Sequence, residues 1–213
     1  MTQTLQKKLV TFDEFVAKYP DNTGKRYELH DGFVVEMAQP TGDHEDVVGF
    51  LALEISADIK RLNLPYYIPK TVLVKPLESE SAYSPDILVI NRPNLVNELL
   101  WKKESTVSQA ASIPLVIEVV STNWRDDYYK KMADYEAIGI AEYWIVDYAA
   151  IGARKFIGNP KQPTISVYQL IDGEYQVTQF RGSDAYGGKQ RIHSFSFSEL
   201  ILTVDQVFQA GYG

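Results

Sequence analysis

The hydrophobic pattern of this chain has two forms, one helical and one typical of buried strands. From Asp43 to about Leu62, apolar residues recur at the spacing of one helix face, which predicts the longest helix. Residues 113–121 instead read Ile-Pro-Leu-Val-Ile-Glu-Val-Val-Ser, an apolar run of the kind that fills a buried strand. A second such strand is expected at residues 87–90, Ile-Leu-Val-Ile.

Turn and capping residues mark the remaining elements. A capping box at residues 11–14 starts a short helix that we expect to end near Tyr19. The pairs Asp31-Gly32 and Asp172-Gly173 predict two hairpins, over residues 26–37 and 165–180. The other expected elements are strands at 66–68, 72–74 and 142–147, a helix at 126–138 closed by Gly139, a surface helix or insertion over 92–112, and a short helix around 204–208.

This order of elements predicts an α/β (α+β) fold. We expect a central mixed β-sheet flanked by helices, with extra β-hairpins. The chain is long enough for one well-filled core. We therefore expect a single domain over residues 1–213, with its core at about 10–170 and a C-terminal hairpin and closing segment at 171–213.

Composition excludes several other classes of protein. Hydrophobic residues make up 45% of the 213 residues and charged residues 23%, which is ordinary for a globular domain. No apolar stretch approaches the ~20 residues of a membrane span, and the N-terminal segment lacks the apolar region of a secretory signal. We therefore expect a cytoplasmic protein without a membrane partner. The absence of cysteine excludes disulfides, thiolate nucleophiles and cysteine-ligated metals.

Net charge and missing motifs narrow the function further. The formal net charge is −7, from 28 acidic and 21 basic residues, which counts against strong non-specific binding to DNA. The chain has no Gly-x-x-x-x-Gly-Lys loop, no Gly-x-Ser-x-Gly elbow and no His-Glu-x-x-His pair. P-loop, serine hydrolase and zinc protease functions therefore have no support in the sequence.

Two carboxylates are candidates for a metal site. Glu118 stands in the middle of the apolar run, where an ionised carboxylate is costly unless it is paired or binds a metal. Asp86 immediately precedes the run at 87–90. Acidic groups on adjacent strands can share a divalent cation, because hard metals bind carboxylate oxygens. The alternative is a strand-end glutamate paired with a lysine or arginine.

The helix after the Glu118 strand carries a possible third component. Asp127, Lys131 and Tyr135 follow one another at i, i+4 and i+8 and share one helix face. From the start of this helix, Lys131 could reach back to the two carboxylates. Metal-dependent phosphodiester cleavage needs a cation and a charge stabiliser or base, which these residues could supply. The alternative is a surface ion pair between Asp127 and Lys131, worth only ~0.3–0.5 kcal/mol.

Several motifs follow one another in order along the chain. They are Tyr27-Glu28-Leu29-x-Asp31-Gly32, His44, Ser84-Pro85-Asp86, Ile117-Glu118-Val119-Val120-Ser121, Asp127-x-x-x-Lys131-x-x-x-Tyr135 and Gly139-x-x-Glu142-Tyr143-Trp144-Ile145-Val146-Asp147. This ordered set, over most of residues 10–170, resembles the Uma-two family of putative restriction endonucleases in the PD-(D/E)xK nuclease superfamily. The resemblance implies a restriction-endonuclease-like core with a Mg²⁺ (or Mn²⁺) site.

One position departs from the superfamily's pattern. Val120 stands where a lysine usually follows the second acidic residue, and the resemblance places that lysine at Lys131 on the next helix. Glu28 and His44 are possible supporting residues, Glu28 by adding a metal contact or holding Lys131 and His44 by orienting water or a phosphate. The alternatives are an exposed hairpin glutamate and a plain surface histidine.

We therefore expect a metal-dependent endonuclease acting on nucleic acid, with DNA as the substrate. Asp86 and Glu118 are the expected metal ligands, and Lys131 stabilises charge or positions water. A homodimer is expected, since C2 dimers are the commonest assembly. The alternative is a catalytically silent module of the same fold that binds nucleic acid or protein. Candidates for a basic rim around the site are Lys70, Lys75, Arg125, Lys130 and Lys131.

Overall fold

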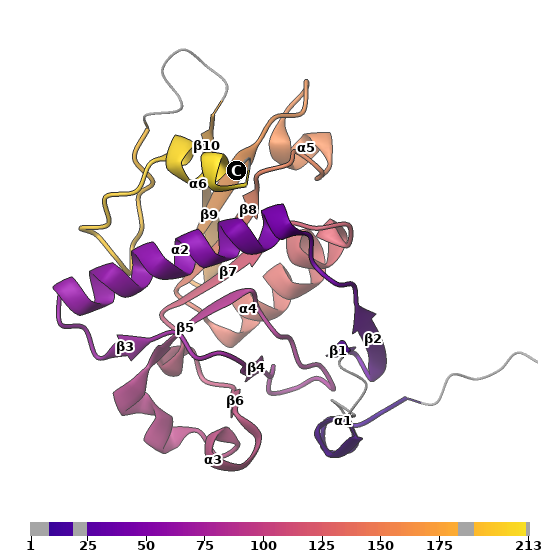
Figure 1. The fold of residues 1–213 in the computed structure, drawn as a ribbon. Helices are drawn as coiled ribbons and strands as arrows, with labels where there is room; N and C mark the ends of the chain where they lie inside the picture. The colour runs from indigo at the N-terminus through magenta and orange to yellow at the C-terminus, as the bar shows by residue number, and fades with distance from the viewer. Residues whose placement is uncertain (1–8, 19–24, 183–189, 212–213) are drawn as a thin grey trace, which may run out of the picture.

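A mixed sheet of six strands lies at the centre of the computed structural model, which describes residues 9–18, 25–182 and 190–211 (Figure 1). The strand order is β10–β9–β8–β7–β5–β3, with β7 and β8 parallel and the other neighbours antiparallel. The expected mixed sheet flanked by helices is confirmed. The strands are β3 (Tyr66–Tyr67), β5 (Ile87–Asn91), β7 (Leu115–Val119), β8 (Glu142–Asp147), β9 (Thr164–Ile171) and β10 (Glu174–Arg181).

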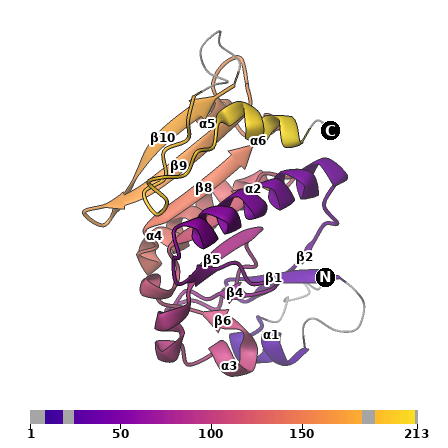
Figure 2. The same cartoon turned by 60° about the vertical axis from the view of Figure 1, so that its left-hand side comes forward.

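Helix α2 (Gly42–Arg61) crosses one face of this sheet, and α6 (Val204–Ala210) lies beside it (Figure 2). The apolar stripe of α2, including Leu51 and Ile55, packs in one core with the inward residues of β5, β7 and β8. The Thr41 hydroxyl accepts a hydrogen bond from the backbone N–H of His44 and so caps the N-terminus of α2. The predicted long helix and closing helix are confirmed.

The opposite face of the sheet is covered by the helix that follows β7. This helix begins at Trp124, continues as the π-helical segment η3 (Asp126–Lys131) and ends as α4 (Met132–Ile138). Gly139, with a φ of 88°, closes it in the left-handed conformation that glycine adopts without strain. The position of this helix agrees with the prediction, but its π-helical first half was not predicted.

A separate two-stranded hairpin and a short helix lie at one end of the sheet. The hairpin consists of β1 (Arg26–His30) and β2 (Phe33–Met37), and Asp31 and Gly32 turn it with positive φ angles of 48° and 80°, as expected. Leu29 and Ala82 exchange backbone hydrogen bonds of 2.9 and 2.8 Å, which attach the hairpin to the segment before β5. The predicted capping box starts α1 (Phe12–Lys18), whose expected end at Tyr19 lies outside the described residues.

Short elements make up the rest of the described chain. The expected insertion over residues 92–112 contains two 3-10 helices, a short α-helix and a strand that pairs in parallel with β4. Helix α5 (Arg154–Ile157) was not predicted. Across the described ranges, no helix has both the length and the apolar character needed to cross a membrane. The short elements are β4 (Leu73–Val74), η1 (Arg92–Asn97), α3 (Trp101–Glu104), β6 (Thr106–Val107) and η2 (Ala110–Ser112).

A candidate active site at the ends of strands β5 and β7

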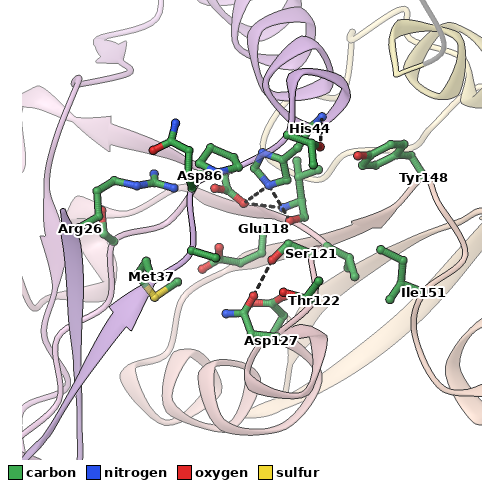
Figure 3. A pocket seen from close by; sticks show the side chains of 18 of the residues that line it. Arg26, Met37, His44, Asp86, Glu118, Ser121, Thr122, Asp127, Tyr148 and Ile151 are labelled. Atoms are coloured by element: carbon green, nitrogen blue, oxygen red, sulfur yellow. Dashed lines mark hydrogen bonds and ion pairs between the residues drawn. The ribbon is translucent and has the colours of Figure 1, made fainter. Parts of the chain in front are cut away.

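Asp86 and Glu118 face each other across two antiparallel strands. The last pair of the β5–β7 ladder is Ile87 and Ile117, and Asp86 and Glu118 each stand one residue beyond that pair. Both side chains line one pocket of about 240 Å³ (Figure 3). The backbone N–H of Val119 donates a 2.8 Å hydrogen bond to Asp86 Oδ2 and orients that carboxylate.

The helix over this face brings Lys131 to Glu118. Lys131 Nζ lies 3.2 Å from Glu118 Oε1, and the Tyr135 hydroxyl donates a 3.1 Å hydrogen bond to the same oxygen. Lys131 Nζ also lies 3.5 Å from Asp127 Oδ1. Lys131 is only 2% exposed and Asp127 only 4%, so the alternative of a surface ion pair is wrong. Val120 packs in the core, and the helix supplies the ammonium group in its place.

Glu28, from the β1–β2 hairpin, is the third carboxylate near Lys131. Its Oε1 lies 3.2 Å from Lys131 Nζ and accepts a 2.9 Å hydrogen bond from the backbone N–H of Ser84. Its Oε2 lies 2.9 Å from His30 Nε2. Glu28 is fully buried, so the alternative of an exposed hairpin glutamate is wrong. The hairpin therefore contributes directly to the charge of the site.

His44 connects the N-terminus of α2 with the Asp86 carboxylate. Its Nε2 donates a 3.0 Å hydrogen bond to the carbonyl oxygen of Val119 and lies 3.5 Å from Asp86 Oδ2. The imidazole is buried, so the alternative of a plain surface histidine is wrong. Burial lowers the pKa of His44, but hydrogen bonding and attraction to Asp86 outweigh burial and raise the pKa above its usual value.

The site has more acidic than basic side chains. Burial, to which repulsion from neighbouring carboxylates adds, outweighs the attraction of Lys131 and raises the pKa of Glu118 well above its usual value and that of Asp127 to about 7. Burial disfavours the ammonium of Lys131, but attraction to its carboxylate partners outweighs burial and raises its pKa, so it stays protonated. Burial opposes ionisation of Glu28, but Lys131, His30 and Ser84 lower its pKa. The excess charge must be balanced by protons or by a bound cation.

The donor set fits Mg²⁺ better than a metal that needs a protein cage. Over residues 9–18, 25–182 and 190–211, no group of three or more His, Cys, Asp or Glu side chains is arranged to hold an ion. Asp86 and Glu118 therefore offer two carboxylates and no complete cage. Mg²⁺ is usually held by one or two carboxylates, with water and substrate phosphate completing its octahedron. Two carboxylates are the number of protein ligands that such a site needs.

The rim of the pocket is mostly neutral and polar, with one cation that sequence reasoning missed. Arg26, at the start of β1, lines the pocket. Among the basic residues expected there, Lys75 donates to backbone carbonyls and Lys130 pairs with Asp31 and Asp134. Arg26 gave no sequence signal, because only the packing of the hairpin against β5 brings it to the site. The polar rim residues are Gln39, Thr41, Ser84, Ser121, Thr122 and Asn123.

Comparisons with known proteins relate this geometry to a family. The model of a family described as "Uma2: Putative restriction endonuclease" matches residues 12–204. A solved structure, described as a putative nuclease belonging to DUF820 from Anabaena variabilis, aligns with a TM-score of 0.71 at 17% sequence identity, over 95% of this chain and 99% of that chain. At this identity the likeness concerns the fold alone. No curated protein matches the chain.

Proposed function

We propose that this chain is a nuclease, because it belongs to the Uma2 family of putative restriction endonucleases. The family and the structural neighbour support a nuclease. We propose more specifically a metal-dependent endonuclease that hydrolyses phosphodiester bonds in DNA. One observation carries this proposal: carboxylates in excess surround a single buried lysine beside an open pocket.

Asp86 and Glu118 are the proposed metal ligands. Lys131 and Tyr135 both donate hydrogen bonds to Glu118 Oε1. We therefore assign the other oxygen, Oε2, to the cation. Val119 and His44 hold the Asp86 carboxylate in place from the other side. When bound, Mg²⁺ (or Mn²⁺) would supply Lewis acidity toward a phosphate and lower the pKa of a water molecule.

Lys131 is the proposed charge stabiliser. Because its pKa is raised, it stays protonated at neutral pH and cannot accept a proton from water. Its ammonium can instead stabilise the negative charge that develops on phosphate oxygens in the transition state. Glu28, Asp127 and Tyr135 fix the position of this ammonium and of its Glu118 partner, and so act as positioning residues.

A catalytically silent module for nucleic-acid or protein binding is the second candidate. The net charge of −7 favours it, because phosphate binding usually requires a basic surface. The position of Lys131 on a helix, and not on the strand of Glu118, favours it as well. A module without catalysis, however, has no need for buried carboxylates in excess of their cationic partner.

A cleavage assay separates the two candidates. The protein is incubated with supercoiled, linear and single-stranded DNA in Mg²⁺, in Mn²⁺ and in EDTA, with Asp86→Asn as control. We expect cleavage with either metal, none in EDTA, and loss of cleavage in Asp86→Asn with the fold retained. Absence of cleavage under all metal conditions, or equal cleavage by Asp86→Asn, would support the silent module.

We also propose that the protein is a homodimer, which would allow it to act on both strands where the DNA is a duplex. A duplex has two antiparallel strands, and a C2 dimer presents two equivalent sites to them. Analytical ultracentrifugation should give a mass twice that of the chain. A monomer that linearises duplex DNA would contradict this part of the proposal.

A further inference from the structure

One exposed and two partly buried aromatic side chains lie together with two exposed cationic side chains near the pocket. Trp124, Arg125 and Tyr129 belong to the first turns of the helix that contains η3, and Lys155 and Phe156 belong to α5 (Figure 1). We call these five residues the aromatic–cation patch. None of them takes part in the carboxylate site described above.

The aromatic–cation patch continues the rim of the pocket. Asn123 and Asp127 line the pocket and alternate in sequence with patch residues on the same helical segment. Ile151, in the loop that leads into α5, lines the pocket as well. Patch residues are therefore chain neighbours of residues that line the pocket.

The rings of the patch form an edge-to-face group anchored in the core. The Phe156 ring stacks on buried Tyr128, with centroids 4.2 Å apart, and stands nearly perpendicular to Tyr129 and Trp124, with centroid distances of 5.4 and 6.5 Å. Tyr129 is 45% exposed. The core thus holds a rigid aromatic surface at the edge of the site.

The cations of the patch lie over these rings. Lys155 Nζ lies 4.5 Å from the Tyr129 ring centroid and 4.6 Å from that of Phe156, and Arg125 Cζ lies 4.8 Å from that of Trp124. In the described ranges neither cation forms an ion pair with a carboxylate, whereas Lys25 and Arg61 do. Exposed Arg154 adds a further positive charge, so the patch stays cationic despite its neighbour Asp126.

The exposed ring of Tyr129 and the partly exposed ring of Trp124, together with cations that form no ion pair within the described residues, match the chemistry of an unpaired nucleotide. Single-stranded nucleic acids bind by stacking bases on aromatic rings while lysine and arginine contact the phosphates. In a duplex the base faces are covered by their neighbours, so a duplex offers the patch only its phosphates.

We propose that the aromatic–cation patch binds unpaired nucleotides and makes single-stranded nucleic acid, or an unpaired segment of a duplex, the preferred substrate of the adjacent site. This inference rests on the proposed nuclease function. It assigns base stacking to Trp124 and Tyr129 and phosphate contact to Arg125 and Lys155. A phosphate held there would lead the next nucleotides into the carboxylate pocket.

Binding measured without metal tests the patch independently of catalysis. Fluorescence anisotropy in EDTA compares a labelled 20-nucleotide single strand with the duplex of the same sequence. We expect tighter binding of the single strand, and a loss of roughly 5- to 100-fold in Tyr129→Ala, the range for removal of one base-stacking ring. Lys155→Gln should reduce the slope of log affinity against log salt by about 0.7, as expected for one lost phosphate contact on a single strand.

Arg92→Gln is the matched control. Arg92 also lies over an aromatic ring, 4.3 Å from the centroid of Tyr67, but at the opposite end of β5 from Asp86. The Arg92→Gln substitution should leave single-strand affinity unchanged.

Tryptophan fluorescence gives a second readout of binding. Trp124→Phe should remove the quenching of this fluorescence by the oligonucleotide. Thermal melting of each variant separates loss of binding from loss of fold.

The outcomes separate this inference from the proposed function. Tighter binding of the duplex, or an equal effect of Tyr129→Ala and Arg92→Gln, would overturn the patch even if the protein cleaves DNA. In that case the patch would be assigned to a protein partner. Single-strand binding that depends on Tyr129 and Lys155, without metal-dependent cleavage of any substrate, would uphold the patch while the nuclease proposal fails.

Discussion

Lys131 determines the charge balance of the candidate site. Its ammonium lies 3.2 Å from Glu28 and Glu118 and 3.5 Å from Asp127, and it is only 2% exposed. Breaking a buried ion pair by removing one partner leaves an uncompensated buried charge. One ammonium thus serves three carboxylates, so the acidic side chains around it outnumber the basic ones.

Lys131→Ala should lower turnover by roughly 10²- to 10³-fold, the range for removal of one donor to transition-state charge. Its effect on Mg²⁺ affinity should be much smaller, because a protonated lysine cannot ligate a cation. Cleavage rates and calorimetric metal titration measure the two effects. Lys130→Ala is the control, since the Lys130 ammonium pairs with Asp31 and Asp134 outside the pocket. Equal rates for Lys131→Ala and wild type would assign the charge to another residue.

Asp127 should make the metal-free protein less stable as pH rises. Its pKa is raised from 3.8 to about 7, mainly by burial, so the folded state keeps a proton that the unfolded chain releases. The stability from this group is fully present below about pH 4 and is lost as pH rises through about 7.

Asp127→Asn should therefore raise the free energy of unfolding at pH 8 by up to about 4 kcal/mol, at about 1.4 kcal/mol per pKa unit, and leave it nearly unchanged at pH 4. Urea denaturation in EDTA at both pH values measures the difference. Asp126→Asn, at the neighbouring position, is the control. A variant that is less stable than wild type at pH 8 would show that Asp127 is ionised and needed as a partner for Lys131.

At the scale of elements, local patterns predicted the strands and helices, and packing supplied what those patterns lack. The apolar run at 113–121 and the terminating Gly139 were sufficient to place β7 and the end of α4. The π-helical segment η3 was missed, because six residues are too few to separate its period from that of an α-helix. The burial of Glu28 was missed, because it depends on the pairing of Leu29 with Ala82, more than fifty residues away.

The β1–β2 hairpin positions Glu28, so its turn should matter to the site. Gly32 has a φ of +80°, and a Cβ there would lie 3.2 Å from Leu9. Gly173 turns the β9–β10 hairpin with a φ of +87° and has open space around it. Gly173→Ala should lower the free energy of unfolding by about 1 kcal/mol through backbone strain. Gly32→Ala should lower it by more.

Urea denaturation and the cleavage rate of the two glycine variants test this expectation. Gly32→Ala should lower the rate as well as the stability, whereas Gly173→Ala should lower stability alone. A full cleavage rate in a folded Gly32→Ala protein would show that the hairpin does not position the site.

At the scale of the whole molecule, the net charge of −7 is the main difficulty for a nucleic-acid enzyme. The sequence predicted a basic rim, but Lys131 is buried, Lys130 is paired, and the cations beside the pocket are Arg26 and those of the aromatic–cation patch. These positions depend on how the hairpin and α5 fold back on the sheet, which a pattern of charges along the chain does not reveal.

Affinity for DNA should accordingly be modest and should fall steeply with salt, with a slope that reports few neutralised phosphates. A divalent cation should strengthen binding, because it cancels the charge of Asp86 and Glu118. Anisotropy titrations with Ca²⁺ and with EDTA, over a range of salt concentrations, measure the gain in affinity for wild type and for Asp86→Asn. The gain should be smaller in Asp86→Asn, which serves as the control. Equal affinity of wild type with and without the cation would show that the carboxylates do not face the bound nucleic acid.

The most direct test of the metal-dependent site compares substitutions of two buried strand glutamates under the same conditions. Glu118 lines the pocket, whereas Glu142, also fully buried, accepts hydrogen bonds of 2.7–3.0 Å from Trp144, Ser194 and the backbone of Ser196. We predict that Glu118→Gln abolishes Mg²⁺-dependent cleavage and raises metal-free stability, because one of several repelling carboxylates is removed. Glu142→Gln should retain cleavage and lose stability. Glu118→Gln protein that cleaves at the wild-type rate, or that is destabilised as Glu142→Gln is, would contradict a metal-binding role for Glu118.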